Sequence, residues 1–425
     1  MKKFIAIVQG LWKSPDLRKR TLIVLGLLTV FRLAANIPLP DVDLDRVRAL
    51  LASNQFLGIL NIFAGNTLSN LSIAMLGVGP YITATIIFQL LTMVYPKFKQ
   101  MYYEEGESGR AKFNQYARLI TIPLGALQGF GFLKFLESQG VIVFASPFAL
   151  FRDIILVTAG TIFLMWLGEL ITEQKLGNGV SLIIFAGIVA RGPEIVRQFA
   201  VSFSMAQINS YIITVLMSLL IVAGVVFVTE AERRIPLNFA KRVRGTKIYG
   251  GSSSYIPLKV NQAGVIPIIF ALSILLFPVT LGQILAATGV GFFATISTFF
   301  QNLSNNQWVF SSIYFLLVFA FTYFYTSITF EPNEMALNFQ RSGAFIPGLR
   351  PGKETAKHLH KLVTRITLFG ALFLGIIAVL PNITQAVTGL GFASIGGTSI
   401  LILVSVAIET VRQMEAELSA RRYEL

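Results

Sequence analysis

The chain has 425 residues, of which 54% are hydrophobic and only 13% are charged, and its mean hydropathy is +0.69. Soluble domains carry about 25% charged residues, so this composition excludes a disordered chain and argues against an ordinary soluble enzyme. It predicts a membrane protein. The formal net charge of +14 has two interpretations, a nucleic-acid binder or a membrane protein with basic loops on one side of the membrane.

Sequence features of an enzyme are absent. The chain has no cysteine and two histidines, His358 and His360, which excludes disulfides, thiolate metal sites and a His-rich metal site. No HExxH, GxSxG or GxxxxGK[ST] motif is present. We therefore expect no catalytic, cofactor-binding or metal-binding residues, and we assign no chemistry to the two histidines.

Residues 1–20 form a basic segment with apolar residues at helical spacing. No small-residue cleavage site follows a short apolar core, so a removable signal is not expected. The pattern favours an amphipathic helix on the membrane surface, and a disordered basic arm is the alternative. The apolar residues of this segment are Phe4, Ile5, Val8, Leu11 and Trp12.

Ten stretches are apolar enough to cross a membrane, which takes about 20 residues each. Residues 260–330 and 366–408 contain no charged side chain at all. The ten predicted spans are 21–39, 72–94, 117–137, 151–172, 180–199, 210–230, 262–282, 308–330, 364–381 and 391–411.

Lys and Arg are divided unequally between the two sets of loops. With both termini on one side, that side receives 28 of the 35 cations and the other side 6, while Arg32 lies within the first span. This imbalance predicts that both termini are cytoplasmic, and it explains the basic charge without nucleic acid. The richer set consists of 1–20, 95–118, 173–179, 231–259, 331–365 and 412–425.

Two of these loops, 231–259 and 331–365, are unusually long and basic. Their charges either only fix the topology or form a docking surface for a cytoplasmic partner.

On the opposite side of the membrane, segment 40–71 contains an apolar piece of about ten residues, which is too short to span the membrane. We expect it to be a re-entrant or plugging element, with an interfacial helix as the alternative.

The span interiors are nearly free of charge. A coupled transporter usually places ionisable residues along its substrate path, whereas here Arg32 is the main exception to nearly charge-free span centres and Glu169 lies towards the end of its span. Ile82 and Ile86 share one helix face, as do Ile184 and Ile188. By spacing alone, such isoleucines are ordinary core or lipid-facing residues. Ten spans also divide as five plus five, which permits inverted repeats around a midplane site.

Six ordered motifs, spread over essentially the whole chain, resemble the SecY family of protein-conducting channels. They are Leu76-Gly77-Val78-Gly79-Pro80-Tyr81-Ile82 through Gln89-Leu90-Leu91, Glu105-Gly106-Glu107-Ser108-Gly109-Arg110, Met165-Trp166-Leu167-Gly168-Glu169 through Gly177-Asn178-Gly179, Lys259-Val260-Asn261-Gln262-Ala263-Gly264-Val265-Ile266-Pro267, Ser342-Gly343-Ala344-Phe345-Ile346-Pro347-Gly348-Leu349-Arg350-Pro351-Gly352, and Gly396-Gly397-Thr398-Ser399.

The resemblance implies an all-α membrane protein with ten spans in two inverted halves, 21–205 and 206–411, followed by a tail, 412–425. It implies a plug helix near 57–67, with Leu57, Ile59, Leu60, Asn61, Ile62 and Phe63. It implies a pore ring that deforms around a passing chain and excludes hydrated ions. By motif alignment the ring is Ile82, Ile86, Ile184, Ile188, Ile269 and Ile402.

The resemblance also implies a lateral gate between spans 72–94 and 262–282, with polar residues Thr92, Gln128 and Asn261. The long loops would receive the SecA ATPase and the ribosome, and Arg350 would sit at the most sensitive loop position. The implied docking residues are Arg233, Arg234, Lys241, Arg242, Arg244, Lys247, Arg341, Arg350, Lys353 and Lys357.

The expected function is therefore a channel subunit in the bacterial cytoplasmic membrane, with no enzymatic activity of its own. It would pass secretory polypeptides across the membrane and release membrane segments sideways into the lipids. SecE and SecG would be its stable partners, and SecA, the ribosome or the membrane potential would supply energy. The alternatives are a secondary transporter, which requires intramembrane charges, and a membrane-embedded hydrolase, which requires a nucleophile and a base.

Overall fold

The structure is a computed structural model, and it describes residues 14–40, 42–43, 46–47, 61, 64–65, 67–202, 205, 208–239, 242–244, 247–249, 253–275, 306–388 and 393–422. Within these residues the chain is mostly helical. The helices are α2 (Pro15–Ala34), η1 (Leu68–Asn70), α5 (Gly79–Val94), α6 (Pro96–Tyr103), α7 (Gly106–Ser138), α8 (Pro147–Glu173), α9 (Gly179–Ala190), α10 (Gly192–Ser202), α11 (Ile208–Glu230), α14 (Gln307–Thr329), α15 (Pro332–Ser342), α16 (Lys353–Thr388) and α17 (Ala393–Arg422). A further helical segment covers Ile266–Leu275.

Five of the described helices are long and apolar enough to cross a membrane by length and composition. They coincide with five of the ten predicted spans, and two shorter apolar helices, Gly79–Val94 and Ile266–Leu275, fall within two more. The molecule is thus a multi-pass membrane protein. The five are Gly106–Ser138, Pro147–Glu173, Ile208–Glu230, Trp308–Ser342 and Lys353–Leu380.

Several predicted boundaries are wrong for local reasons. The first helix begins at Pro15, inside the segment predicted to lie on the membrane surface, because proline favours the first turn of a helix. Residues 1–13 lie outside the described part of the chain. The predicted span 180–199 is split into α9 and α10 at Arg191, because Pro193 lacks the N–H that would continue the first helix.

The prediction of an all-α chain is incomplete, because loop 231–259 forms a β-hairpin. Strand β1 (Glu232–Phe239) pairs antiparallel with β4 (Ser253–Lys259), and Ile235 lies opposite Ile256. The tip consists of β2 (Arg242–Arg244) and β3 (Lys247–Tyr249). A short strand, β5 (Ala344–Phe345), pairs with the end of β1, so the sheet order is β4-β1-β5.

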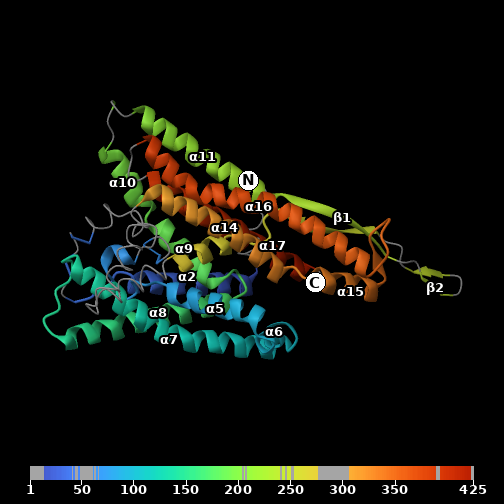
Figure 1. Cartoon of the computed structure of the whole chain (residues 1–425), viewed down its shortest axis with the longest axis horizontal. Coiled ribbons are helices and arrows are strands. Elements are labelled where there is room, and N and C mark those ends of the chain that lie inside the picture. The colour runs from blue at the N-terminus through green and yellow to red at the C-terminus, as the bar shows by residue number, and fades with distance from the viewer. Residues whose placement is uncertain are drawn as a thin grey trace.

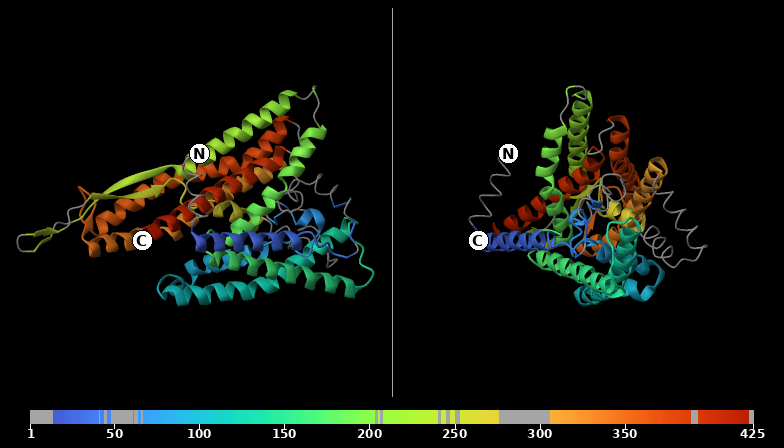
Figure 2. Two further views of the ribbon diagram at one scale, coloured as in Figure 1. Left: turned by 180° about the vertical axis from the view of Figure 1, so that it is seen from behind. Right: turned by 90° about the vertical axis from the view of Figure 1, so that its left-hand side faces the viewer.

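The helices are arranged in two groups with the hairpin at one end. Helices α2, α5, α7 and α8 lie in one group and α11, α14 and α16 in the other, with α9 and α17 between them (Figure 1). The view from behind and the end-on view agree with this arrangement (Figure 2). Helix α9 packs directly against α17, so the two groups meet along these two helices.

Candidate functional site

All six isoleucines predicted to form the pore ring are buried, and all belong to one connected hydrophobic cluster. They come from α5, α9, the segment Ile266–Leu275 and α17, which are far apart in the sequence. Their exposed fractions are 9% or less. The fold therefore brings into one core a set of side chains that helical spacing alone could not connect. The six are Ile82, Ile86, Ile184, Ile188, Ile269 and Ile402.

The end of the predicted plug segment lies directly against this core. A Cβ placed on Gly187 of α9 would lie 2.3 Å from the Cα atom of Gly65. Gly187 comes three residues after Ile184, so the two share one side of the helix. A Cβ on Gly77 would lie 2.6 Å from the Cα atom of Ala64. Residues 64–65 are thus held in backbone contact from two sides.

Asn61 is the residue of the predicted plug set that the structure describes, and its side chain is 2% exposed. Its Nδ2 donates a hydrogen bond to Ser69 Oγ at 2.7 Å, and its Oδ1 accepts one from the Ser69 N–H at 3.1 Å. The Thr67 hydroxyl donates to the carbonyl of Ala64 at 2.8 Å. These bonds join Asn61 to Ser69 and Ala64 to Thr67. Leu57, Ile59, Leu60, Ile62 and Phe63 lie outside the described residues.

The predicted gate residues occupy three separate elements. Thr92 is buried near the end of α5, where its hydroxyl donates to the Gln89 carbonyl at 2.7 Å. Gln128 is half-buried on α7. Asn261 is buried before the segment Ile266–Leu275; its Nδ2 donates to the Gly264 carbonyl at 3.1 Å, and its Oδ1 has no partner among the described residues.

The segment that follows Asn261 is packed against α14. The ring of Phe270 makes edge contacts with the rings of Phe321 and Tyr325, at centroid distances of 6.1 and 6.0 Å. Helix α14, which overlaps the predicted span 308–330, therefore lies beside the segment Ile266–Leu275.

The two long basic loops fold together into one unit. They share a hydrophobic cluster that is separate from the main core. Its buried residues are Ile235 and Leu237 of β1, Leu258 of β4, Ile346, and Leu359 and Val363 of α16. We call this unit the basic module: strands β1–β5, α15 and residues 353–365 of α16. It extends beyond the helices, with β2 at its far end (Figure 1). Sequence spacing did not indicate that the two loops share a core.

The predicted docking residues are distributed over this basic module. Arg233 and Arg234 lie on β1, Arg341 in the last turn of α15, Arg350 just before α16, and Lys353 and Lys357 in its first turns. Thr355 ties Arg350 in place, because its hydroxyl donates to the Arg350 carbonyl at 2.9 Å. Only the backbone is described at Arg242, Arg244 and Lys247, which form the β2–β3 tip, and Lys241 lies outside the described residues.

Arg234 is held close to the hairpin surface. Its Nε lies 2.9 Å from Glu232 Oε1, and its guanidinium lies over the ring of Tyr255 at 4.9 Å. The hydrogen bond to Glu232 raises the pKa of Arg234. The charge of Arg234 is therefore paired within the hairpin, whereas Arg233 lines a hollow together with residues of α16.

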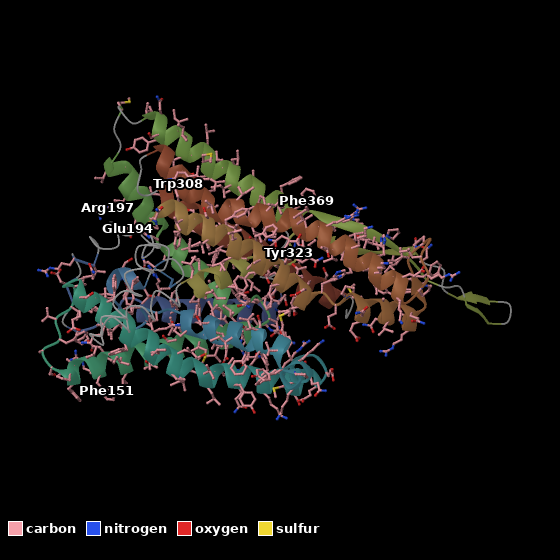
Figure 3. All side chains as sticks on the ribbon, in the orientation of Figure 1. Phe151, Glu194, Arg197, Trp308, Tyr323 and Phe369 are labelled. Carbon is pink, nitrogen blue, oxygen red and sulfur yellow. The ribbon has the colours of Figure 1, made fainter. Side chains whose placement is uncertain are left out.

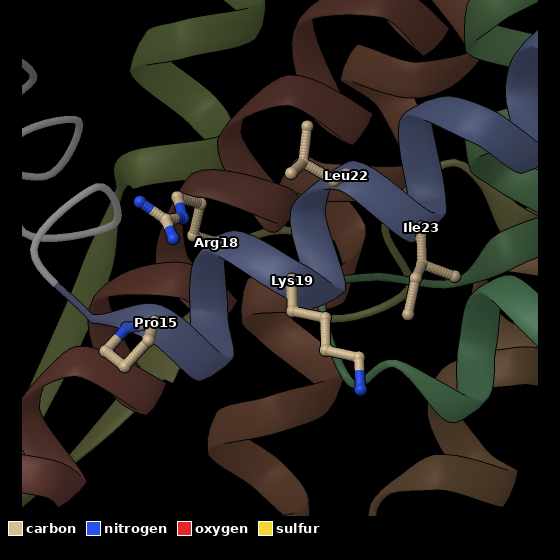
Figure 4. Close-up of a pocket in the computed structure, with 5 residues that line it drawn as sticks. All are labelled: Pro15, Arg18, Lys19, Leu22 and Ile23. Atoms are coloured by element: carbon tan, nitrogen blue, oxygen red, sulfur yellow. The ribbon is translucent and has the colours of Figure 1, made fainter.

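One ionisable group of the predicted spans, Glu169, forms an ion pair with a neighbouring helix. Glu169 of α8 accepts from the Nε of Arg118 on α7 at 2.5 Å, although the sequence had presented Glu169 as a lone carboxylate. Among the described residues no group of three His, Asp or Glu side chains could hold a metal ion. An open hollow on α2, lined by Pro15, Arg18, Lys19, Leu22 and Ile23, contains no acid or acceptor side chain (Figure 4).

These features define a multi-pass helical membrane protein with an apolar centre and a separate basic module. A family model matches residues 72–411 to the SecY family. Curated relatives named Protein translocase subunit SecY include one from Streptomyces scabiei, 41% identical over 97% of each chain, and one from Synechocystis sp., 40% identical over 97% of this chain and 94% of that one. The chain therefore belongs to the SecY family, and it is a channel subunit rather than an enzyme.

Solved structures share the fold. A protein-conducting channel structure aligns with a TM-score of 0.64 at 21% identity, covering 94% of this chain and 91% of that chain. Sec61 from a canine ribosome–channel complex aligns with a TM-score of 0.62 at 20% identity, with the same coverage.

Proposed function

We propose that this chain is the pore-forming subunit of a channel that moves unfolded secretory polypeptides across the bacterial cytoplasmic membrane and releases apolar segments sideways into the lipid. The observation that carries the proposal is the burial of all six aligned isoleucines in one core. In this proposal they form the constriction, which seals around a chain without offering it hydrogen bonds and disfavours hydrated ions by dewetting.

In the same proposal the plug is residues 57–67, resting against α9 in the closed channel. The contact of Gly65 with Gly187 supports this, because it places the end of the plug segment one helical turn from Ile184. The lateral gate runs between α5 and the helix that begins at Ile266, and Thr92, Gln128 and Asn261 provide polar groups near the seam. The full set of ten spans in two inverted halves, 21–205 and 206–411, belongs to this proposal.

The basic module is proposed as the cytoplasmic docking surface, with both termini on the same side. Its own hydrophobic cluster supports the proposal, since loops that only fix topology need no core. Two of the structural neighbours are ribosome-bound channels, a canine Sec61 complex and the yeast Ssh1 complex, and we propose the ribosome and the SecA ATPase as partners of this module. SecE and SecG complete the proposed assembly.

The pore assignment is tested by Ile188→Asn in vesicles containing the reconstituted channel. We expect increased ion leak without substrate, because a polar side chain wets the constriction. Ile171→Asn is the matched control, since Ile171 is also a buried isoleucine of the same core, on α8. Equal leak from both variants would indicate general destabilisation and contradict the ring. An arrested secretory chain should also crosslink to positions 82, 86, 184 and 188, and absence of these crosslinks would contradict the path.

A further inference from the structure

A basic groove of about 270 Å³ lies between β1 and α16. Arg233 contributes to it from the hairpin, and the helix contributes residues spaced by three or four, which lie on one helix face. Its floor is apolar, because Leu362 and Ile366 are partly buried against the core of the basic module. The helical residues are His358, Lys361, Leu362, Arg365 and Ile366.

The cations around this floor are free to bind a ligand. Arg233, His358, Lys361 and Arg365 are all exposed, and within the described ranges no ion pair or hydrogen bond of theirs is found. Arg234, the next residue along β1, contrasts with them because it is already paired with Glu232. Three permanent cations therefore converge on one apolar hollow without a carboxylate to neutralise them.

The groove lies where α16 enters its apolar stretch. Arg365 is the last charged residue before the uncharged run 366–408, and α16 provides one of the span-length helices. The groove face of the helix continues as Phe369, Leu372 and Ile376, which are 70%, 39% and 53% exposed. Figure 3 labels Phe369 on α16 near the start of β1. A cationic hollow thus opens directly onto an exposed apolar stripe.

We propose that this groove binds one anionic phospholipid, with its phosphate among Arg233, Lys361 and Arg365 and an acyl chain along Phe369, Leu372 and Ile376. Basic pockets at the boundary of membrane helices bind anionic headgroups, and the attraction falls off within a Debye length. A zwitterionic lipid would leave the cations without net neutralisation. A nucleic acid would neutralise them but has no group to cover the apolar floor and stripe. The proposal is independent of whether the isoleucine core conducts polypeptides.

The absence of cysteine makes a site-specific test possible. Phe369→Cys in the full chain, labelled with bimane, would be reconstituted into phosphatidylcholine vesicles containing a small fraction of brominated phosphatidylglycerol or brominated phosphatidylcholine. Bromine quenches the label only on contact. We expect quenching to favour phosphatidylglycerol by at least about tenfold in relative association at low salt, from three cations at a membrane surface. High salt should reduce this preference.

Two controls make the result specific. A triple variant that removes the groove cations should lose the preference for phosphatidylglycerol; its substitutions are Arg233→Gln, Lys361→Gln and Arg365→Gln. A control triple variant that removes three cations elsewhere should keep the preference; its substitutions are Lys97→Gln, Lys99→Gln and Lys112→Gln. A label at Leu216→Cys on the exposed side of α11 should show no preference. Equal quenching by both lipids at position 369, or a preference that survives the groove substitutions, would overturn the proposal. Loss of oligo-uridine binding in the groove variant, without any lipid preference in the parent, would instead assign the groove to nucleic acid.

Discussion

Gly187→Ala offers a direct test of whether residues 64–65 seal the closed channel. The added methyl group would lie 2.3 Å from the Cα atom and 2.4 Å from the carbonyl oxygen of Gly65, where ordinary contact begins at 3.4 Å. Both neighbours are backbone atoms, so no side chain can rotate away. Residues 64–65 must therefore separate from α9 by about 1 Å. A Cβ built on Gly77 would lie 2.6 Å from the Cα atom of Ala64, so the backbone of Gly77 limits the movement of residues 64–65 away from α9.

In the proposed mechanism the energetic cost falls on the closed arrangement alone. Overpacking a well-packed contact costs about 1–3 kcal/mol. Since the clash exists only while residues 64–65 lie on α9, a change of that size shifts the balance between closed and displaced plug by about 5- to 150-fold. We expect resting ion conductance to rise within that range, because conductance without substrate follows the fraction of channels whose plug is displaced.

The measurement is ion flux through reconstituted channels without a secretory chain. Gly26→Ala is the matched control, because a Cβ on Gly26 of α2 meets nothing within 4 Å. This control should conduct like the parent. Resting conductance of Gly187→Ala equal to that of the parent, with or without reduced thermal stability, would refute the reasoning that this contact holds a seal.

Three further results are expected. Asn61→Ala removes both hydrogen bonds to Ser69, at a cost of about 1–3 kcal/mol, and should raise resting conductance; an unchanged conductance would show that these bonds do not hold the plug. Glu169→Gln should lower the thermal unfolding midpoint more than Glu173→Gln, because it removes the ion pair that joins α8 to Arg118 of α7; equal effects would contradict this. Burial, with Arg412 nearby, lowers the pKa of Lys259. Between that lowered pKa and the ordinary lysine value of about 10.4, the unfolded chain binds more protons than the folded chain, so the free energy of unfolding should rise with pH across this window. Lys259→Met should abolish this rise. A rise that persists in the variant would contradict the assignment to Lys259.

Much of the fold could be predicted because bilayer physics acts on each segment separately. Apolar runs of sufficient length must become helices, whatever their neighbours are, and five predicted spans coincide with span-length helices. The hairpin was missed although its signal is present. Inward and exposed positions alternate along both strands, as is typical of a strand with one buried face. The two runs are Ile235-Pro236-Leu237 and Ile256-Pro257-Leu258. Proline is tolerated at position 236 because β5 pairs only with residues 238 and 239.

The candidate site was predictable only in part, because its residues are joined by tertiary contacts. Nothing in the spacing of Ile82 or Ile184 distinguishes a constriction from ordinary core, and only the family resemblance connected these residues with Ile402. The glycines carried more local information than the isoleucines. Gly187 is required because any Cβ there collides with the backbone of Gly65, and Gly65 itself has a φ of +74° that favours glycine. A contact between residues so far apart in the chain cannot be predicted from the sequence around either glycine.

This difference bears on how the proposed seal could work. Isoleucines are soft, interchangeable apolar groups, so a ring of them tolerates a passing chain and closes again by packing alone. A contact between two glycines is instead either made or broken, because backbone atoms cannot rearrange to preserve it. Gly187 lies on α9 within one helical turn of both Ile184 and Ile188, so in this proposal a polypeptide that moves α9 at these side chains also strains the contact with Gly65. The helix that carries part of the proposed ring is therefore also the helix that releases the proposed plug.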